Sequence, residues 1–375
     1  MSPIDQKQAL LLNFTASTYH WGCYGTSMEV WTSLVERGYY VEMVNVREIH
    51  LLEPTPQQLK DFDQAEFGIA FLKATPRLYH MLLSSDVVYV NGEGTLHGPN
   101  KAAINLLYLM YMAKINFKKP VYLINSSFFP ADNGQAHPQL DAIYGHVARV
   151  IDHIVPREAQ SLAVLARLGV TATQGFDCLP RFIQRHGLIG SHEFTPTVVV
   201  AGGVNMTQEQ TLQFGQALNK AHRAGTQYVF LTGAKAMLNS EDARIFEALR
   251  SVFPALTCVN AQSMREWLEV MARAACVVSA RFHHSLAAVS LGTPCLVFPS
   301  NTPKTHAVMQ MLGVDTLPSL SHDTSVIGDF VSAALQQHLQ PIAPKLVAHV
   351  VELASHNFFE TASMAPLHLF RKTSQ

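Results

Sequence analysis

An arginine and two histidines stand where an apolar run gives way to a helical pattern. Residues 276–280 predict a buried strand, and residues 283–291 predict a helix of small apolar residues. Free N–H groups at a helix start favour an anion, and a planar guanidinium adds a two-pronged donor. We therefore predict Arg281 and His283 as catalytic residues at an anion site. The other interpretation makes Arg281 half of a stabilising ion pair and one histidine a helix cap.

His284 directly follows His283 on the same predicted helix. A helix turns by about 100° per residue, so adjacent imidazoles cannot both face one ligand. If His283 faces the ligand, His284 turns towards neighbouring packing. His284 is kept as a candidate substrate contact.

A glycine-rich turn follows a second apolar run, at residues 92–98. Gly92 and Gly94 allow backbone amides to approach a phosphate or a sugar closely. Glu93 and His97 are candidates for acid–base work or hydroxyl binding, and Thr95 for substrate contact. We predict His97 as catalytic and the other four as substrate-binding residues. A structural tight turn, with His97 capping the next helix, explains the segment nearly as well.

The segment at 18–27 lies between the first predicted strand and the first predicted helix. Its glycines would let a ligand lie against the backbone, and its polar side chains offer contacts. The substrate-binding candidates here are His20, Gly22, Tyr24 and Thr26. An ordinary strand-to-helix loop accounts for them almost equally well.

Three further candidates stand at strand ends. Arg157 ends one strand and begins a helical pattern, and is predicted to bind substrate; the alternative is a surface pair with Glu158. Gly203 and Lys235 end strands in the second half of the chain and are weaker candidates for donor contacts.

Short β-branched runs alternate with helical patterns, which is typical of parallel βαβ units. The predicted strands of the first half are 9–14, 40–46, 86–91, 121–125 and 151–155. Those of the second half are 197–201, 228–232, 255–259, 276–280 and 295–298. Helices are predicted between them, among them 27–37, 101–117, 157–168, 241–252 and 264–274.

The alternation breaks between Asp177 and Pro196, where we place a linker. The prediction is an α/β protein with two Rossmann-like domains facing a cleft: 1–180, 190–340, and helices of 341–375 packed near the linker. In such sheets ligands sit beyond the carboxyl ends of the strands, which is where several of the candidate motifs fall.

Composition limits the partners. Of 375 residues, 48% are hydrophobic and 15% charged, with a formal net charge of -1. This balance supplies two buried cores and argues against nucleic acid or an anionic membrane as a partner. The longest apolar helical stretch, at 102–113, is well short of the roughly 20 residues that span a bilayer. The start of the chain resembles a first strand more than a signal peptide, and we expect a cytoplasmic protein.

Cysteine and histidine usage gives no metal signature. The five cysteines form no CxxC pair, and none of the 18 histidines lies in an HExxH spacing. We therefore expect neither a disulfide scaffold nor a metal site.

Four segments together resemble the polysaccharide pyruvyl transferase family. The most specific is Arg-x-His followed by Gly-x-Pro, here Arg281, His283 and residues 292–294. The glycine-rich turn at 92–98, the segment from Arg157 to Gly169 and the tripeptide at 175–177 occur in the family's order. The resemblance covers roughly residues 18–298.

The resemblance implies a fold like the GT-B glycosyltransferases and a reaction that uses phosphoenolpyruvate. The family moves the enolpyruvyl unit onto two sugar hydroxyls, giving a cyclic pyruvate ketal and phosphate. By this resemblance Arg157 and Arg281 would hold the phosphate and carboxylate, His283 would transfer the proton, and His97 would assist. The first domain would take a saccharide or lipid-linked glycan acceptor, and the second would take phosphoenolpyruvate. No metal or organic cofactor is implied.

Two other functions stay open. One is a glycosyltransferase that uses a nucleotide sugar on the same fold, and the other is a non-catalytic carbohydrate-binding protein. The acceptor sugar, the linkage and stereochemistry of the ketal, and the oligomeric state, with a homo-oligomer as one option, are not fixed by the sequence.

Overall fold

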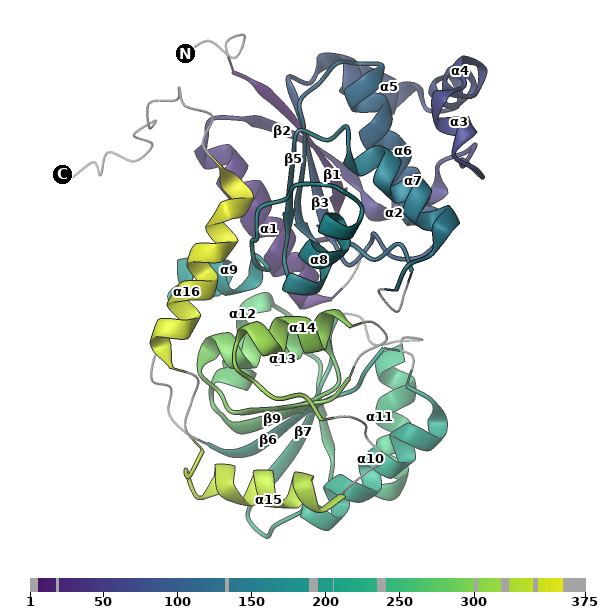
Figure 1. Cartoon of the computed structure of the whole chain (residues 1–375). Helices are drawn as coiled ribbons and strands as arrows, with labels where there is room; N and C mark the ends of the chain where they lie inside the picture. Colours follow the sequence, from purple (N-terminus) through teal and green to yellow (C-terminus); the bar gives the residue numbers. More distant parts are fainter. Residues whose placement is uncertain are drawn as a thin grey trace, which may run out of the picture.

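Two parallel β-sheets, one from each half of the chain, build the protein (Figure 1). The computed structural model describes residues 6–17, 20–131, 135–188, 195–204, 206–234, 241–299, 303–317, 324–339 and 343–359. No helix within these ranges is both long and apolar enough to cross a membrane.

The first sheet has the strand order β2-β1-β3-β4-β5, with every pair parallel. Its strands are β1 (Gln8–Phe14), β2 (Tyr40–Asn45), β3 (Val87–Glu93), β4 (Val121–Ser126) and β5 (His153–Pro156). The helices that connect or follow them are α1 (Trp21–Glu36), α2 (Val46–Leu51), α3 (Lys60–Asp63), α4 (Ala65–Ala74), α5 (Pro76–Ser84), α6 (Lys101–Ile115), α7 (Pro138–Ala148) and α8 (Ala159–Arg167).

The second sheet has the order β10-β9-β6-β7-β8, also parallel throughout. Its strands are β6 (Thr195–Ala201), β7 (Gln227–Leu231), β8 (Thr257–Val259), β9 (Ala274–Ser279) and β10 (Cys295–Val297). Its helices are α10 (Gln208–Ala221), α11 (Glu241–Val252), α12 (Met264–Ala272), α13 (Phe282–Leu291), α14 (Lys304–Met311) and α15 (Thr324–Leu335).

Each sheet has one place where the strand order reverses. In the first sheet this place lies between β1 and β3, and in the second between β6 and β9. Loops that leave such neighbouring strands run to opposite faces of the sheet and open a crevice at their carboxyl ends. Each domain therefore has one crevice of the kind in which ligands bind.

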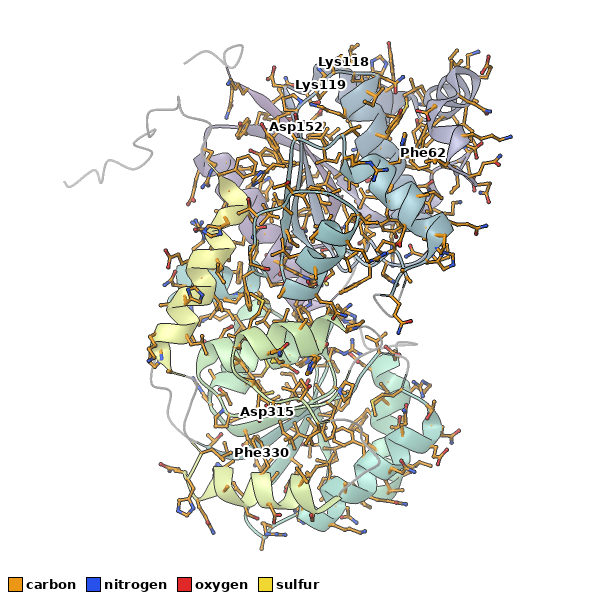
Figure 2. The ribbon with its side chains drawn as sticks, in the orientation of Figure 1. Phe62, Lys118, Lys119, Asp152, Asp315 and Phe330 are labelled. Carbon is orange, nitrogen blue, oxygen red and sulfur yellow. The ribbon has the colours of Figure 1, made fainter. Side chains whose placement is uncertain are left out.

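The central strands are buried on both faces, as helices on both sides of a parallel sheet require. Every residue of β3 and β9 is buried, and so is every residue of α13. Aromatic residues fill the helical layer of the first sheet. Phe62, labelled in Figure 2, meets Tyr108 and Tyr111 edge-on at centroid distances of 5.4 and 5.8 Å.

An apolar cluster joins the two domains. It unites α9 (Leu179–Arg185) with α12 and α13 of the second domain, and α1 of the first packs against it. The last helix, α16 (Pro344–Ser355), returns along α9 beside the junction (Figure 1). In the short helix η2 (His356–Phe358), the Asn357 side chain accepts a hydrogen bond from the backbone N–H of Asn125 at 2.6 Å.

The first predicted helix begins six residues earlier than the sequence pattern indicated, at Trp21 rather than residue 27. Gly22 and Gly25 are therefore helical, not part of a loop. A Cβ on Gly22 would lie 2.1 Å from His283 Cβ, and one on Gly25 would lie 2.7 Å from Met264. These glycines allow the helix to pack closely against its neighbours.

Candidate active site

A cavity of about 320 Å³ is walled by both domains, at the carboxyl ends of both sheets. Its lining comes from the segments after β1, β2, β3, β5, β6 and β9 and from the first turns of α1, α2, α6, α13 and α14. The lining residues are Thr15, His20, Cys23, Val46, Glu93, Gly94, Thr95, His97, Asn100, Ala102, Arg157, Val204, Arg281, Phe282, His283 and Lys304. Both strand-order reversals thus open into one space.

The structure brings eight of the candidates together around the cavity. Six have ionisable side chains, namely His20, Glu93, His97, Arg157, Arg281 and His283, and the other two are Gly94 and Thr95. Those outside its lining are Gly22, Tyr24, Thr26, Gly92, Gly203 and His284. Lys235 lies outside the described residues.

The candidates outside the lining have packing or supporting roles. A Cβ on Gly92 would meet the Ser126 side chain at 2.3 Å, and one on Gly203 would meet Ala280 at 2.9 Å. Tyr24 packs in the interdomain cluster. Thr26 donates a hydrogen bond to Asp177 Oδ1 at 3.0 Å. The sequence placed these residues near the right junctions, but they do not line the cavity.

His284 does not line the cavity. It is 1% exposed, and its Nε2 accepts a hydrogen bond from Trp267 Nε1 at 3.2 Å. Burial, followed by the nearby charge of Arg281, lowers its pKa well below the ordinary value. His284 is therefore a neutral core histidine, and its inclusion among the substrate contacts is corrected.

Arg157 is buried at the cavity wall rather than paired with Glu158 on the surface. Its Nη1 lies 2.7 Å from Asp177 Oδ2, its Nε donates to Ser127 Oγ at 2.9 Å, and its guanidinium stacks over the Phe282 ring at 4.6 Å. Nη2 makes no hydrogen bond to any described residue. Glu158 instead caps α8, accepting from the Ser161 N–H at 3.0 Å.

Lys304, which the sequence analysis missed, is the second cation on this wall. It is the first residue of α14, and it has no ion pair within the described ranges. A Cβ on Gly94 would lie 3.0 Å from Lys304 Nζ and 3.5 Å from Arg157 Nη2. Burial, and then the charge of Arg157, lower the pKa of Lys304 to about 8. Two cationic groups therefore converge on the open side of Gly94.

His283 stands between a thiol and a carboxylate. Its Nδ1 lies 3.8 Å from Cys23 Sγ, and its Nε2 lies 3.7 Å from Asp177 Oδ2. Burial works to raise the pKa of Asp177, but hydrogen bonding with His283 and the charge of Arg157 outweigh it and lower that pKa. Asp177 is therefore an ionised group shared by His283 and Arg157.

Arg281 is surrounded by protein acceptors. Nη2 lies 2.7 Å from Asp242 Oδ1, Nε donates to the Gly202 carbonyl at 3.1 Å, and Nη1 lies 3.1 Å from both ring nitrogens of His20. Burial, and then the charge of Arg281, lower the pKa of His20 to about 3. His20 is thus a neutral imidazole at the edge of the cavity.

Glu93 is a fixed carboxylate at the end of β3. It has a left-handed backbone (φ 40°), and its Oε1 accepts hydrogen bonds from Asn91 Nδ2 at 3.0 Å, from Ser27 and from Thr15. Its position is set by these donors. His97 lines the cavity close by along the chain, while Asn100 caps α6 by accepting from the Ala103 N–H at 2.9 Å.

One set of ligand-type side chains could hold a metal ion among the residues described. Cys23, Glu93 and His283 each bring a ligand atom within 4.8 Å of the others. The spacing of these residues in the chain gave no sign of the cluster, because three separate elements supply it.

A family model described as polysaccharide pyruvyl transferase matches residues 30–302. Among solved structures, the Anabaena protein HepE in complex with UDP-glucose is 10% identical, with a TM-score of 0.55 over 94% of this chain and 95% of that one. A UDP-GlcNAc 2-epimerase from Neisseria meningitidis bound to UDP-GlcNAc is 12% identical, with a TM-score of 0.55 over 93% and 97%. No curated protein matches by sequence. These structures confirm the predicted GT-B-like pair of Rossmann-like domains.

Proposed function

We propose, because the chain belongs to the polysaccharide pyruvyl transferase family, that it moves the enolpyruvyl group of phosphoenolpyruvate onto two hydroxyls of a sugar. The two sugar hydroxyls lose their protons, one going to the methylene carbon and the other leaving with phosphate, while both sugar oxygens bond to the central carbon. The product is a cyclic pyruvate ketal. The observation that carries this proposal is the convergence of Lys304 Nζ and Arg157 Nη2 on Gly94, in the same cavity as His283.

The donor has two anionic groups, and the cavity has three cationic side chains. Lys304 and Arg157 would take one group between them, with the small Gly94 leaving room for its oxygens. Arg281 Nη1, which is shared with His20, would take the other. We assign the phosphate to Lys304 and Arg157, because leaving phosphate carries more charge than the carboxylate does.

His283 would deliver the proton to the methylene carbon. The ionised carboxylate of Asp177, 3.7 Å from Nε2, orients the ring. Glu93 would accept a proton or a hydrogen bond from a sugar hydroxyl, since a carboxylate has acceptor capacity beyond the donors that fix it. His97, from the same turn, would assist on the acceptor side.

The acceptor would extend away from the cavity along the first domain. A second hollow of about 700 Å³ is lined by Pro99 and Lys101, which alternate along the chain with Asn100 and Ala102 of the active-site lining. Gln57, Gln139 and other polar side chains also line it. We propose that further sugars of a glycan or lipid-linked acceptor lie there.

The direct test is release of phosphate from phosphoenolpyruvate in the presence of β-galactoside and mannosamine acceptors. We expect acceptor-dependent release and a product whose mass shows one added pyruvate ketal. Absence of release with every acceptor, in a folded protein that binds saccharides, would support a non-catalytic carbohydrate-binding protein instead.

A nucleotide-sugar glycosyltransferase is the second candidate. It is favoured by the similar solved structures that contain UDP-sugars. A ligand that binds the folded state raises the melting temperature by mass action, so the two functions predict different stabilising ligands. We expect phosphoenolpyruvate, and not UDP-glucose, to stabilise the protein. The opposite result would favour the glycosyltransferase.

A further inference from the structure

Three side chains that commonly bind transition metals meet at the wall of the cavity. Cys23 comes from α1, Glu93 from the end of β3 and His283 from α13, and their ligand atoms all lie within 4.8 Å of one another. Cys23 Sγ and His283 Nδ1 are 3.8 Å apart. Zinc bonds of about 2.3 Å to sulfur and 2.0–2.1 Å to nitrogen place tetrahedral ligand atoms roughly 3.5 Å apart. The pair needs only a small inward movement to share an ion.

The groups behind these ligands resemble the outer shell of a metal site. A metal-bound histidine usually donates its other ring N–H to a carboxylate. Here His283 Nε2 faces Asp177 Oδ2 at 3.7 Å, which leaves Nδ1 directed at Cys23. Glu93 is held in turn by Asn91, Ser27 and Thr15. Both the imidazole and the carboxylate are therefore oriented in advance.

Some of the surrounding charges favour binding of a cation and others oppose it. Asp177 and Glu93 favour a cation, whereas Arg157 and Lys304 oppose it, since both lie near Gly94. A site with one thiolate, one imidazole and one carboxylate is still selective for thiophilic ions over Mg²⁺ or Ca²⁺, which prefer oxygen ligands. Three protein ligands leave a fourth position open towards the cavity.

We propose that Cys23, Glu93 and His283 form a binding site for a thiophilic divalent cation such as Zn²⁺, and that occupancy inhibits the enzyme. The bound ion takes the imidazole nitrogen and the carboxylate out of proton transfer. Metal binding stands on the ligand geometry alone, and only the inhibition rests on the proposed function.

Cobalt(II) provides the test of binding, because a Co²⁺–thiolate bond gives a charge-transfer absorption in the near ultraviolet. The full chain, reduced and anaerobic, is titrated with Co²⁺ alone. We expect one equivalent to produce the band and Zn²⁺ to displace it. Cys23→Ser should abolish the band, whereas Cys258→Ser, which removes a half-buried thiol from β8, should keep it. No band in the unmodified protein, or an unchanged band in Cys23→Ser, overturns the site.

His283→Ala provides a second check on the ligand set. It should keep the thiol but weaken Co²⁺ binding by at least about tenfold, as expected when a ligand is lost. Unchanged Co²⁺ affinity would remove His283 from the site.

Inhibition is measured separately, as phosphate release with and without Zn²⁺, each variant being compared with its own metal-free rate. We expect inhibition that a chelator reverses, and about tenfold weaker inhibition of Cys23→Ser. Equal inhibition of both proteins overturns the inhibitory role. If the proposed reaction itself fails, the Co²⁺ titration still decides whether the metal site exists.

Discussion

Arg157 and Arg281 each stand directly after a strand of one domain, β5 and β9, yet the structure uses them differently. Each follows a strand of its sheet, each is buried, and each lies 2.7 Å from an aspartate oxygen. Arg281 is surrounded by Asp242, the Gly202 carbonyl and His20. Arg157 keeps Nη2 without a hydrogen bond to any described residue, beside Lys304.

The comparison shows that the capacity of a buried arginine to bind an anion depends on how many of its N–H donors the protein itself does not use. A guanidinium has five N–H groups, and each one held by the protein is no longer available to a ligand unless the protein contact breaks. We therefore propose that Arg157 is the stronger anion-binding residue. In this proposal Arg281 chiefly fixes the geometry of the second crevice, with one nitrogen at the cavity.

The largest expected effect on turnover comes from replacing His283, the histidine that contacts Asp177 together with Arg157. His283→Ala should lower turnover by about 10²–10⁴-fold, the usual contribution of a proton-transfer residue. His284→Ala should instead destabilise the fold by about 1–3 kcal/mol, because it leaves the buried Trp267 N–H without its acceptor. The measurements are steady-state phosphate release and melting temperature of both variants.

An active His283→Ala beside a stable, inactive His284→Ala would reverse the assignment. Equal loss of turnover in both would mean only that the start of α13 borders the active site.

Lysine substitutions test the two arginines directly. Arg157→Lys and Arg281→Lys keep the charge but lose the planar fork, and each should lower kcat/KM by about 10–100-fold, the worth of a charge-assisted hydrogen bond. Arg157→Lys should act mainly by raising KM for phosphoenolpyruvate. Arg281→Lys should act mainly by lowering kcat, because its contacts position the crevice. The opposite division between KM and kcat would contradict the comparison, and near-normal turnover in Arg281→Lys would remove that residue from the site.

The pH dependence tests Lys304, the neighbour that distinguishes Arg157 from Arg281. Its amine, with a pKa lowered to about 8, is charged below that pH and loses its proton above it. Since only the charged form binds an anion, kcat/KM for phosphoenolpyruvate should fall above about pH 8, by about tenfold per pH unit. Lys304→Arg should lack this fall, because a guanidinium stays protonated. The same alkaline fall in the variant would assign it to another group.

The smallest expected effects are those of alanine substitutions at two glycines, Gly94 and Gly203. In Gly94→Ala the new Cβ meets the flexible end of Lys304 at 3.0 Å, so the fold should tolerate it while donor binding weakens severalfold. In Gly203→Ala it meets the Ala280 carbonyl at 3.1 Å and its Cβ at 2.9 Å, so stability should fall by about 1–3 kcal/mol. Melting temperature and KM of the two variants separate these effects. A stable Gly203→Ala with raised KM would return that residue to the ligand site.

Much of the fold was predictable because buried strands and helices leave periodic patterns. The helix predicted at 241–252 coincides with α11 (Glu241–Val252). Some strand starts were less accurate. Two were predicted two residues early, at 151 and 255, and two were predicted two residues late, at 197 and 276, because each of these strands begins where pairing with a neighbouring strand begins. The early start of α1 was hidden by its glycines, which resemble a loop in sequence but allow close packing in space.

The site was predictable only as far as strand ends reveal it. That rule identified Arg157, Arg281 and His283, and it would have identified Lys304 had it been extended past β10. The partners of these residues could not be predicted. Asp177 and Asp242 lie 20 and 39 positions from the arginines they contact, and no local pattern encodes such a pairing. For the same reason the sequence could not predict which N–H groups of each guanidinium face the cavity.

The return of α16 to the first domain has a mechanical consequence. The chain passes from one domain to the other twice, and near both passages α9 and α16 pack together in one apolar cluster with α12 and α13. Two chain connections side by side would restrict twisting and sliding between the domains more than rotation about the line that joins them. Because the cavity walls come from both sheets, such a rotation would change the separation between Arg157 and Arg281 and with it the fit of a ligand that touches both. The Asn357 hydrogen bonds to Asn125 and to the Phe176 carbonyl hold η2 on the first domain, so removing residues 356–359 should loosen this joint.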